Sequence, residues 1–239
     1  MKFGVIVFPG SNCDLDSYHL VGDILNEPVD YIRYNADSVE DYDIIILPGG
    51  FTYGDYLRSG AIAARTPVMK AVHAFAEKGG LILGICNGFQ VLTEAGLLPG
   101  ALYRNNNLQF RCRQVYVRVE NTNLPFTNKA VPGDLLQMPV AHGDGNYYLS
   151  SKKLQELKYS KQIIFRYADS KGELTEDANP NGSVDNICGV SNPAGNVVGL
   201  MPHPERAGEK VLGSEDGLVI FKSLLEYFKN REVRGGTWA

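Results

Sequence analysis

Residues 84–88 limit the possible folds of this chain more than any other segment, because they place a cysteine between two glycines, as Gly84-Ile85-Cys86-Asn87-Gly88. An apolar run at 81–85 leads into the cysteine, and a helical pattern follows at 89–95. A strand that turns directly into a helix needs glycine on both sides of the turning residue, since a Cβ atom there would collide with the neighbouring element. The pattern predicts that Cys86 lies on a strained turn with its side chain directed outward.

Short apolar runs alternate with helical patterns over the first part of the chain. Strands are expected at 2–8, 29–34, 43–47 and 81–85, and helices at 15–25, 67–79 and 89–95. The connections between the strands are long enough for parallel pairing. The sequence therefore predicts an α/β fold with a doubly wound, mostly parallel open sheet and helices on both faces.

From about Gln114 onward, valines alternate with polar residues, which is typical of strands with one buried face. Further short strands are expected at 135–141, 163–167, 187–190 and 197–201. These segments predict an antiparallel extension of the sheet. Ser214 is expected to cap a last helix. We expect a surface loop at 169–185 and a flexible tail at 231–239. The whole chain, residues 1–239, is expected to form a single domain.

Charge and hydropathy exclude several classes of partner. The chain carries 23 lysines and arginines against 27 aspartates and glutamates, a formal net charge of −4. This composition lacks the positive field that holds nucleic acid. No apolar run approaches the roughly 20 residues that span a bilayer, and the run near the N-terminus is too short for a signal peptide. We therefore expect a cytoplasmic protein that binds neither nucleic acid nor membrane.

Motifs for common cofactors are missing from the sequence. It contains no G-x-x-x-x-G-K-[ST] loop, no G-x-G-x-x-G after a strand, no H-E-x-x-H and no C-x-x-C. We expect no metal and no cofactor in this chain, so any ATP-driven step would take place on another polypeptide.

Cys86 is the best candidate nucleophile. At the N-terminus of a helix, the partial positive charge of the first amides favours a thiolate over a thiol. The alternative is that Cys86 is a small buried residue in a strand-to-helix turn. Cys13, Cys112 and Cys188 have no comparable sequence context, so we expect them to be buried and assign them no chemistry.

A thiol nucleophile usually works with a base, and histidine is the commonest one. His19 and His73 fall inside expected helices, whereas His142 and His203 each follow an expected strand. Spacing alone favours His203 over His142, because Glu205 lies two residues further on and could orient the imidazole. The alternative for this Pro-flanked segment is a rigid loop with a surface ion pair.

A developing oxyanion would need two backbone N–H donors. The Asn87 amide, directly after the nucleophile, is one candidate, and an amide within residues 48–51 is the other. The alternative for the Pro-Gly-Gly segment at 48–50 is a tight turn that only ends a strand.

Three segments together resemble the class I (triad) glutamine amidotransferases. They read Leu47-Pro48-Gly49-Gly50, Gly84-Ile85-Cys86-Asn87-Gly88-Phe89-Gln90 and Pro202-His203-Pro204-Glu205. More narrowly, 8–14, 49–60 and 141–145 are similar to the corresponding segments of the glutaminase subunits of phosphoribosylformylglycinamidine synthase. The resemblance covers about residues 3–229 and implies a flavodoxin-like sheet.

The resemblance implies a function in purine biosynthesis. Cys86 would attack the side-chain amide of glutamine, His203 would transfer the proton, and Glu205 would hold His203. The ammonia released would pass to a large ATP-using synthetase subunit, which would also bind magnesium, and a small third subunit would bridge the two. Gly50 and Asn87 would be the oxyanion donors.

The resemblance also assigns substrate-binding residues, namely Gln90, His142 and Gly143. Asp144 departs from the family pattern, which has a longer acid at this position. Two other functions are compatible with the fold. A peptidase or deglycase with an elbow cysteine commonly carries histidine directly after it, where this chain has Asn87. A flavodoxin-like binding module would use residues 9–12 to cradle a phosphate.

Overall fold

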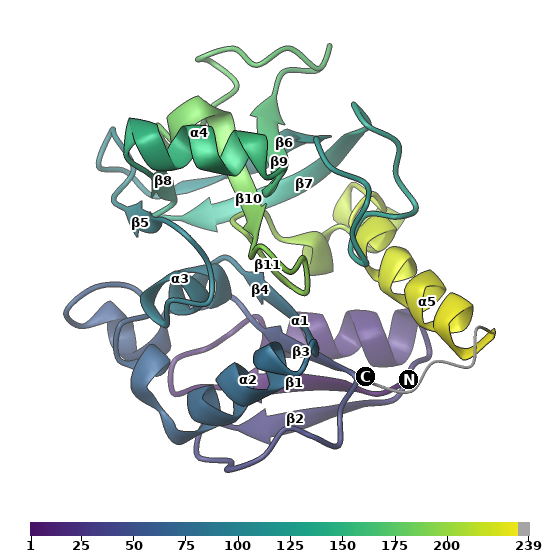
Figure 1. Cartoon of the computed structure of the whole chain (residues 1–239). Coiled ribbons are helices and arrows are strands. Elements are labelled where there is room, and N and C mark those ends of the chain that lie inside the picture. The colour runs from purple at the N-terminus through teal and green to yellow at the C-terminus, as the bar shows by residue number, and fades with distance from the viewer. Residues whose placement is uncertain (234–239) are drawn as a thin grey trace.

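The computed structural model describes residues 1–233, and its centre is a nine-stranded sheet (Figure 1). One half of this sheet consists of parallel strands in the order β2 (Val29–Arg33), β1 (Phe3–Val7), β3 (Ile44–Leu47), β4 (Leu81–Ile85) and β11 (Val197–Leu200). The four expected parallel strands are therefore present. The placement of 197–201 in the antiparallel extension was wrong, because β11 pairs in parallel with β4 and is antiparallel only to its other neighbour.

The other half of the sheet is antiparallel. It continues from β11 through β10 (Ile187–Ser191), β9 (Ile163–Ala168), β6 (Arg111–Val119) and β7 (Leu135–His142). A separate two-stranded sheet pairs β5 (Ala101–Tyr103) with β8 (Asn146–Tyr148). The doubly wound sheet with an antiparallel extension is confirmed, while the small second sheet was not predicted.

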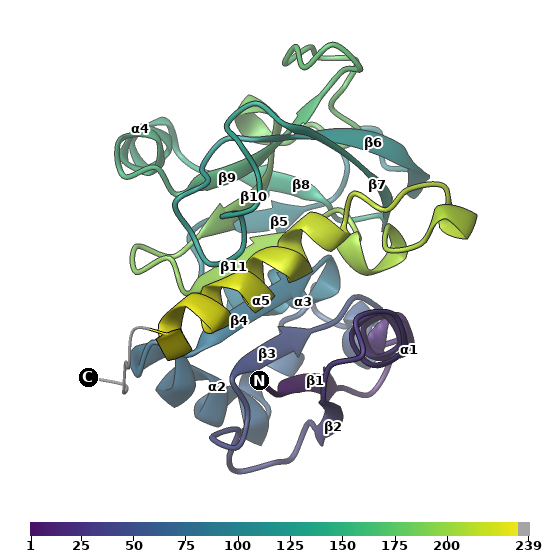
Figure 2. The ribbon, with the colours of Figure 1, turned by 90° about the vertical axis from the view of Figure 1, so that its right-hand side faces the viewer.

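The helices are α1 (Asp14–His19), α2 (Pro67–Glu77), α3 (Asn87–Glu94), α4 (Ser151–Tyr159) and α5 (Leu218–Val233). A π-helical turn at Leu20–Ile24 extends α1 over the rest of the expected helix. Helices α1 and α2 lie on opposite faces of the parallel half (Figures 1 and 2), as right-handed crossovers in opposite directions require. Helix α4 was not predicted.

Helix α5 continues through Val233 and so includes the first residues of the expected flexible tail. The remainder of that tail, including Trp238, lies outside the described residues. Within the described part of the chain, no helix combines the length and the apolar character needed to cross a membrane.

The core follows from the two-sided covering of the parallel strands. Every residue of β3, β4 and β11 is buried. Strands covered on both faces read as continuous apolar runs, which is why these segments could be recognised in the sequence.

The strand β6 differs from these strands, since its first four residues are not buried. Cys112 lies there and is exposed, so its expected burial was wrong, whereas Cys13 and Cys188 are buried.

Parallel strands bring segments that are distant in sequence to one edge of the sheet. The carboxyl ends of β1, β3, β4 and β11 are followed by residues 8–13, residues 48–51, Cys86 and His203, respectively. Ligands of open α/β sheets bind at this edge. The order of the strands alone therefore places the candidate residues at one edge of the sheet.

Candidate active site

Cys86 lies on a strained turn between β4 and α3, as the sequence predicts. Its backbone has φ 50° and ψ −104°, a conformation that side chains rarely adopt. A Cβ atom at Gly88 would collide with the carbonyl group of Leu47, and one at Gly84 would lie 2.9 Å from the Gly88 carbonyl carbon. Glycine at both positions therefore lets β3, β4 and α3 pack closely while the cysteine remains at the bend.

His203 and Glu205 form a buried pair next to this cysteine. The Nδ1 atom of His203 lies 2.6 Å from Oε1 of Glu205, and the two residues are 1% and 3% exposed. Proline at 204 starts the short 3-10 turn Pro204–Arg206, which fixes the backbone between them. Burial alone lowers the pKa of His203, but the negative charge of Glu205 and the neighbouring Cys86 outweigh it and raise that pKa well above its ordinary value.

The second ring nitrogen of His203 is available for proton transfer. Nε2 is buried and makes no hydrogen bond of ordinary geometry, although the thiols of Cys86 and Cys13 lie close enough to raise the pKa of the ring. One nitrogen is thus oriented by a carboxylate while the other faces the sulfur. This is the arrangement in which an imidazole accepts a thiol proton.

A cavity of about 310 Å³ opens in front of Cys86. Five of the predicted site residues line it, namely Gly50, Cys86, Gln90, His142 and Gly143. The other lining residues are Phe51, Gly54, Asp55, Ser59, Arg104, Phe110, Ala141 and Asp144. His203 and Glu205 are buried behind the cysteine, so the site combines a reactive group with a space for a small substrate.

Of the two predicted oxyanion donors, Gly50 lines this cavity, whereas Asn87 is buried directly after Cys86 and is not among the lining residues. Asn87 is the first residue of α3, and its amide has no acceptor within the helix because the first turn never does. Gly50 has φ +143°, and a Cβ atom there would lie 2.7 Å from both the Asn12 nitrogen and the Ser11 Cα. Only glycine allows the chain after β3 to pack so closely against the chain after β1, which brings residue 50 to the cavity wall.

Gln90 is fixed by two side-chain hydrogen bonds. Its Nε2 donates to the carbonyl oxygen of Asp144 at 2.6 Å, and its Oε1 accepts from Nδ2 of Asn87 at 2.7 Å. Oδ1 of Asn87 in turn accepts from the Thr52 amide at 3.1 Å. These contacts join α3 to the segments on either side of the cavity.

His142 lines the cavity but has both ring nitrogens occupied. Nδ1 lies 3.1 Å from Oδ1 of Asn105, and Nε2 lies 3.4 Å from Nδ2 of Asn181. Burial, assisted by the nearby His203, lowers the pKa of His142 to about 4. The neutral ring is therefore favoured at physiological pH, and with both nitrogens occupied His142 is less suited than His203 to accept a thiol proton.

Charged side chains also line the cavity. Asp144 accepts a hydrogen bond from the Ser59 hydroxyl at 2.8 Å, and Nε of Arg104 lies 3.7 Å from its other oxygen. Burial, together with the negative charge of Asp144, raises the pKa of Asp55. The sequence analysis assigned no role to Asp55 or Arg104. Asp55 ends the 3-10 turn Thr52–Asp55 within the 49–60 segment, and Arg104 lies on the loop after β5.

Cys13 is the other residue that sequence reasoning missed. It was expected to be inert, but its Sγ lies 3.1 Å from Nη2 of Arg206, beside the His203 ring. Burial raises the pKa of the Cys13 thiol and keeps it protonated. The signal that could have found it is its place directly after β1, whose carboxyl end lies at the same sheet edge as Cys86.

Cys13, His203 and Glu205 also form the only cluster of potential metal ligands among the described residues, with ligand atoms within 4.8 Å of one another. His203 and Glu205 already bond to each other, and a guanidinium contacts the sulfur, so a cation would displace these contacts. The cluster therefore suits proton transfer better than metal binding.

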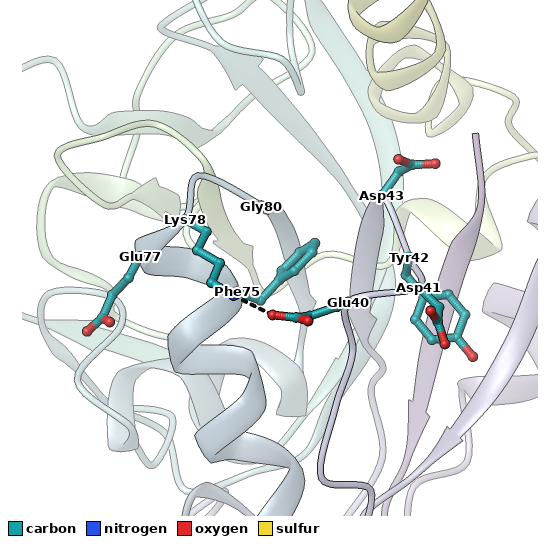
Figure 3. Close-up of a pocket in the computed structure, with 8 residues that line it drawn as sticks. All are labelled: Glu40, Asp41, Tyr42, Asp43, Phe75, Glu77, Lys78 and Gly80. Atoms are coloured by element: carbon teal, nitrogen blue, oxygen red, sulfur yellow. Dashed lines mark hydrogen bonds and ion pairs between the residues drawn. The ribbon is translucent and has the colours of Figure 1, made fainter. Parts of the chain in front are cut away.

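A larger cavity, of about 620 Å³, lies at the opposite edge of the sheet (Figure 3). It is lined by residues 40–43, just before β3, and by Phe75, Glu77, Lys78 and Gly80, just before β4. An ion pair joins Glu40 and Lys78 across it. None of the predicted site residues lines this cavity, so its volume does not mark the reactive centre.

Comparison with known proteins agrees with this geometry. Residues 1–228 match the family described as the CobB/CobQ-like glutamine amidotransferase domain. The chain is 55% identical over 225 residues to "Phosphoribosylformylglycinamidine synthase subunit PurQ" of Aquifex aeolicus, covering 94% of this chain and 99% of that protein. Identity to the protein of the same name from Moorella thermoacetica is 54% over 235 residues, covering 98% and 100%.

A solved structure is also similar. "Structure of PurLQS from Thermotoga maritima" contains a chain with 44% sequence identity and a TM-score of 0.84, covering 95% of this chain and 98% of that one. Sequence and structure thus agree over almost the whole length, and the chain belongs to the CobB/CobQ-like glutamine amidotransferase family.

Proposed function

We propose that this chain is the glutaminase subunit of a phosphoribosylformylglycinamidine synthase and that it releases ammonia from glutamine through a thioester on Cys86. The observation that carries the proposal is the strained cysteine beside the buried His203–Glu205 pair, at the base of a cavity of about 310 Å³. The relatives named PurQ, which match along almost their whole length, support the same conclusion.

The first half of the reaction forms the thioester. The Cys86 sulfur attacks the side-chain carbonyl carbon of glutamine while Nε2 of His203 takes the thiol proton. The carbonyl oxygen becomes an oxyanion, which the amides of Gly50 and Asn87 stabilise. When the carbon–nitrogen bond breaks, His203 returns its proton to the leaving nitrogen, and ammonia departs. Glu205 stabilises the imidazolium between these two steps.

The second half regenerates the enzyme. Water attacks the thioester carbonyl, and His203 accepts a proton from that water. The carbon–sulfur bond breaks, the sulfur recovers its proton, and glutamate leaves. The same imidazole serves in both halves because its Nδ1 stays bonded to Glu205 at 2.6 Å.

The charged residues that line the cavity fit the amino acid head of glutamine. The carboxylates of Asp55 and Asp144 would attract its α-ammonium group, and the Arg104 guanidinium would attract its α-carboxylate. Asp144 is shorter than the acid expected here, and Ser59 compensates by donating to its carboxylate at 2.8 Å.

The ammonia is used by partner subunits. The similar structure from Thermotoga maritima is described as PurLQS, a name that supports a large synthetase subunit and a small third subunit as partners. ATP and magnesium would bind to the synthetase subunit, since this sequence contains no nucleotide-binding loop. We place the assembly in the cytoplasm.

The two alternative functions fit the structure less well. A peptidase or deglycase with an elbow cysteine would carry a histidine at position 87, whereas Asn87 bonds to Gln90 and Thr52 here. A phosphate cradle at 9–12 would need free amides, but the Asn12 amide donates to the Gly49 carbonyl at 3.3 Å. The chain after β3 therefore already fills that loop.

Substitution of Cys86 tests the proposal in the assembled complex. Cys86→Ser should abolish synthesis from glutamine and leave synthesis from added ammonia intact, because the serine hydroxyl is a far weaker nucleophile. Cys112→Ser, at an exposed thiol, is the matched control and should retain both activities. Loss of both activities in Cys86→Ser, or retention of glutamine use, would contradict the proposal.

A further inference from the structure

Two buried asparagines hold the wall of the active-site cavity without lining it. Asn105 lies on the loop after β5, and Asn181 lies on the loop after β9. Each is 0% exposed, and neither belongs to the cavity lining. Burying an amide is costly unless its hydrogen bonds are satisfied, so their partners indicate what these two side chains do.

Asn105 binds one side of the segment 142–145. Its Nδ2 donates to the carbonyl oxygen of His142 at 2.9 Å, and its Oδ1 accepts from the Gly145 amide at 3.0 Å. The same Oδ1 lies 3.1 Å from Nδ1 of His142. The backbone amide of Asn105 also donates to the Gly143 carbonyl at 2.8 Å. A single residue therefore contacts three of the four residues of the segment.

Asn181 binds the other side. Its Nδ2 donates to the Gly145 carbonyl at 2.8 Å and lies 3.4 Å from Nε2 of His142. Its Oδ1 accepts from the amide and the hydroxyl of Ser183, at 3.0 and 2.7 Å. These acceptor contacts fix the orientation of the amide, so its amino group must face the histidine.

The histidine between the two amides has a defined protonation. The Asn105 oxygen can only accept, so the single proton of the neutral ring is on Nδ1. Nε2 then faces the amino group of Asn181, which also donates to the Gly145 carbonyl and to the Tyr167 hydroxyl, at 2.8 and 3.2 Å. The ring also lies flat against Gly145, where an added Cβ atom would be 2.5 Å from Nδ1 and 2.7 Å from Nε2. The His142 ring therefore fills the space between the two asparagines, and its position depends on both side chains.

We propose that Asn105 and Asn181 are positioning residues of the glutamine pocket, which fix the segment 142–145 by hydrogen bonds to its backbone and by holding the His142 ring between them. The inference rests on the proposed glutaminase function. It also gives a role to part of the 169–185 loop, which was expected at the surface but buries Asn181 and Ser183.

The segment 142–145 matters because it contains Asp144, which lines the pocket. Its carbonyl accepts from Gln90 at 2.6 Å, and its carboxylate faces the region assigned to the α-ammonium group. Loosening the segment would move this carboxylate while leaving Cys86, His203 and Glu205 in place, since neither asparagine contacts those three residues. The asparagines should therefore affect the binding of glutamine and not the chemical step.

Steady-state kinetics of the assembled complex tests this division. In Asn181→Ala and in Asn105→Ala we expect the KM for glutamine to rise about 3- to 10-fold, the range for weakening one polar contact between the Asp144 carboxylate and the substrate, with kcat changed less than about 2-fold. Synthesis from added ammonia should be unchanged. Asn196→Ala is the matched control, because Asn196 is also buried and its Nδ2 donates to two backbone carbonyls, at 2.9 Å each, far from the pocket.

The outcomes separate a positioning role from a purely structural one. Thermal unfolding of all variants reports any loss of stability. If Asn181→Ala does not fold, the same KM measurement is made on Asn105→Ala and on Asn181→Ser. The serine variant retains a hydroxyl donor. An unchanged KM in the folded variants, or the same KM in Asn196→Ala as in Asn181→Ala, would overturn the inference. A parent complex that does not use glutamine would instead overturn the proposed function.

Discussion

At the level of single residues, His142 and His203 both lie near Cys86 but differ in the charge that their surroundings favour. Glu205 offers His203 a carboxylate at 2.6 Å, and its pKa is raised. Asparagine amides surround His142, and its pKa is lowered to about 4. Because the protonated form is stabilised at only one of them, the proposed mechanism places the proton taken from the cysteine on His203.

Replacement of Glu205 tests the first of these environments. Glu205→Gln keeps the size of the side chain but removes the negative charge that offsets burial of the imidazolium, so the pKa of His203 should fall. We expect kcat for glutamine hydrolysis to drop by about 10²- to 10⁴-fold, the usual contribution of a positioned acid–base group. Synthesis from ammonia by the complex is the control, and a kcat within a few-fold of the parent would contradict the role of Glu205.

Replacement of His142 tests the second environment through stability. A histidine whose pKa is lowered on folding contributes stability above its unfolded pKa of 6.5, and that contribution is lost as the pH falls toward about 4. Unfolding by denaturant should therefore show the parent losing roughly 3 kcal/mol more than His142→Gln between pH 7 and pH 4. Equal losses in the two proteins would show that His142 is not held neutral in the folded state.

At the level of elements, the strand-to-helix turn depends on close packing of β3, β4 and α3. Gly88→Ala places a Cβ atom against the Leu47 carbonyl, which can yield only if the backbone moves. We expect a loss of about 1–3 kcal/mol in the free energy of unfolding, typical of overpacking, together with reduced glutaminase activity. The measurement is denaturant unfolding combined with an assay of the complex.

Gly133→Ala is the control in which the added methyl group meets no neighbouring atom. Gly133 has φ +93° and open space around it, so the substitution reports the cost of the left-handed conformation alone. It lies on the loop before β7, away from the turn, and should leave glutamine use intact. If Gly88→Ala were as active as Gly133→Ala, tight packing beneath the cysteine would not be required for catalysis.

Elements could be predicted where local sequence determines them. The buried strands β3, β4 and β11 read as continuous apolar runs, and the elbow glycines have a specific steric requirement. The short strands β5 and β8 have no such signal, since their stability comes from pairing with each other. Helix α4 is mostly polar with one buried leucine, Leu157, so its apolar pattern is weak.

Residues of the candidate site could likewise be predicted only where the local sequence identifies them. Cys86, His203 and Glu205 could be found because each stands in a distinctive local pattern. The pairing of Cys13 with Arg206 joins residues 193 positions apart, and only the sheet topology brings them together. Asn181 resembles any other residue of a polar loop until the fold places it against His142.

At the level of the whole molecule, the two halves of the sheet contribute different parts of the active site. The parallel half ends at one edge with Cys86, His203 and the 48–51 segment, which carry out the proposed chemistry. The antiparallel half supplies the opposite wall through the end of β7 and the segment 142–145. Because the nine strands form one hydrogen-bonded sheet, the distance between nucleophile and pocket wall is fixed by the fold and does not depend on a flexible linker.

The most direct test of this account is mass spectrometry of the assembled complex, quenched with acid during turnover of glutamine. We predict a glutamyl adduct on the peptide that contains Cys86, absent from Cys86→Ser and undiminished in Cys112→Ser. Glutamine consumption with the adduct on a different residue, or with no covalent adduct under conditions that trap thioesters, would contradict the central claim that the Cys86 sulfur is the nucleophile.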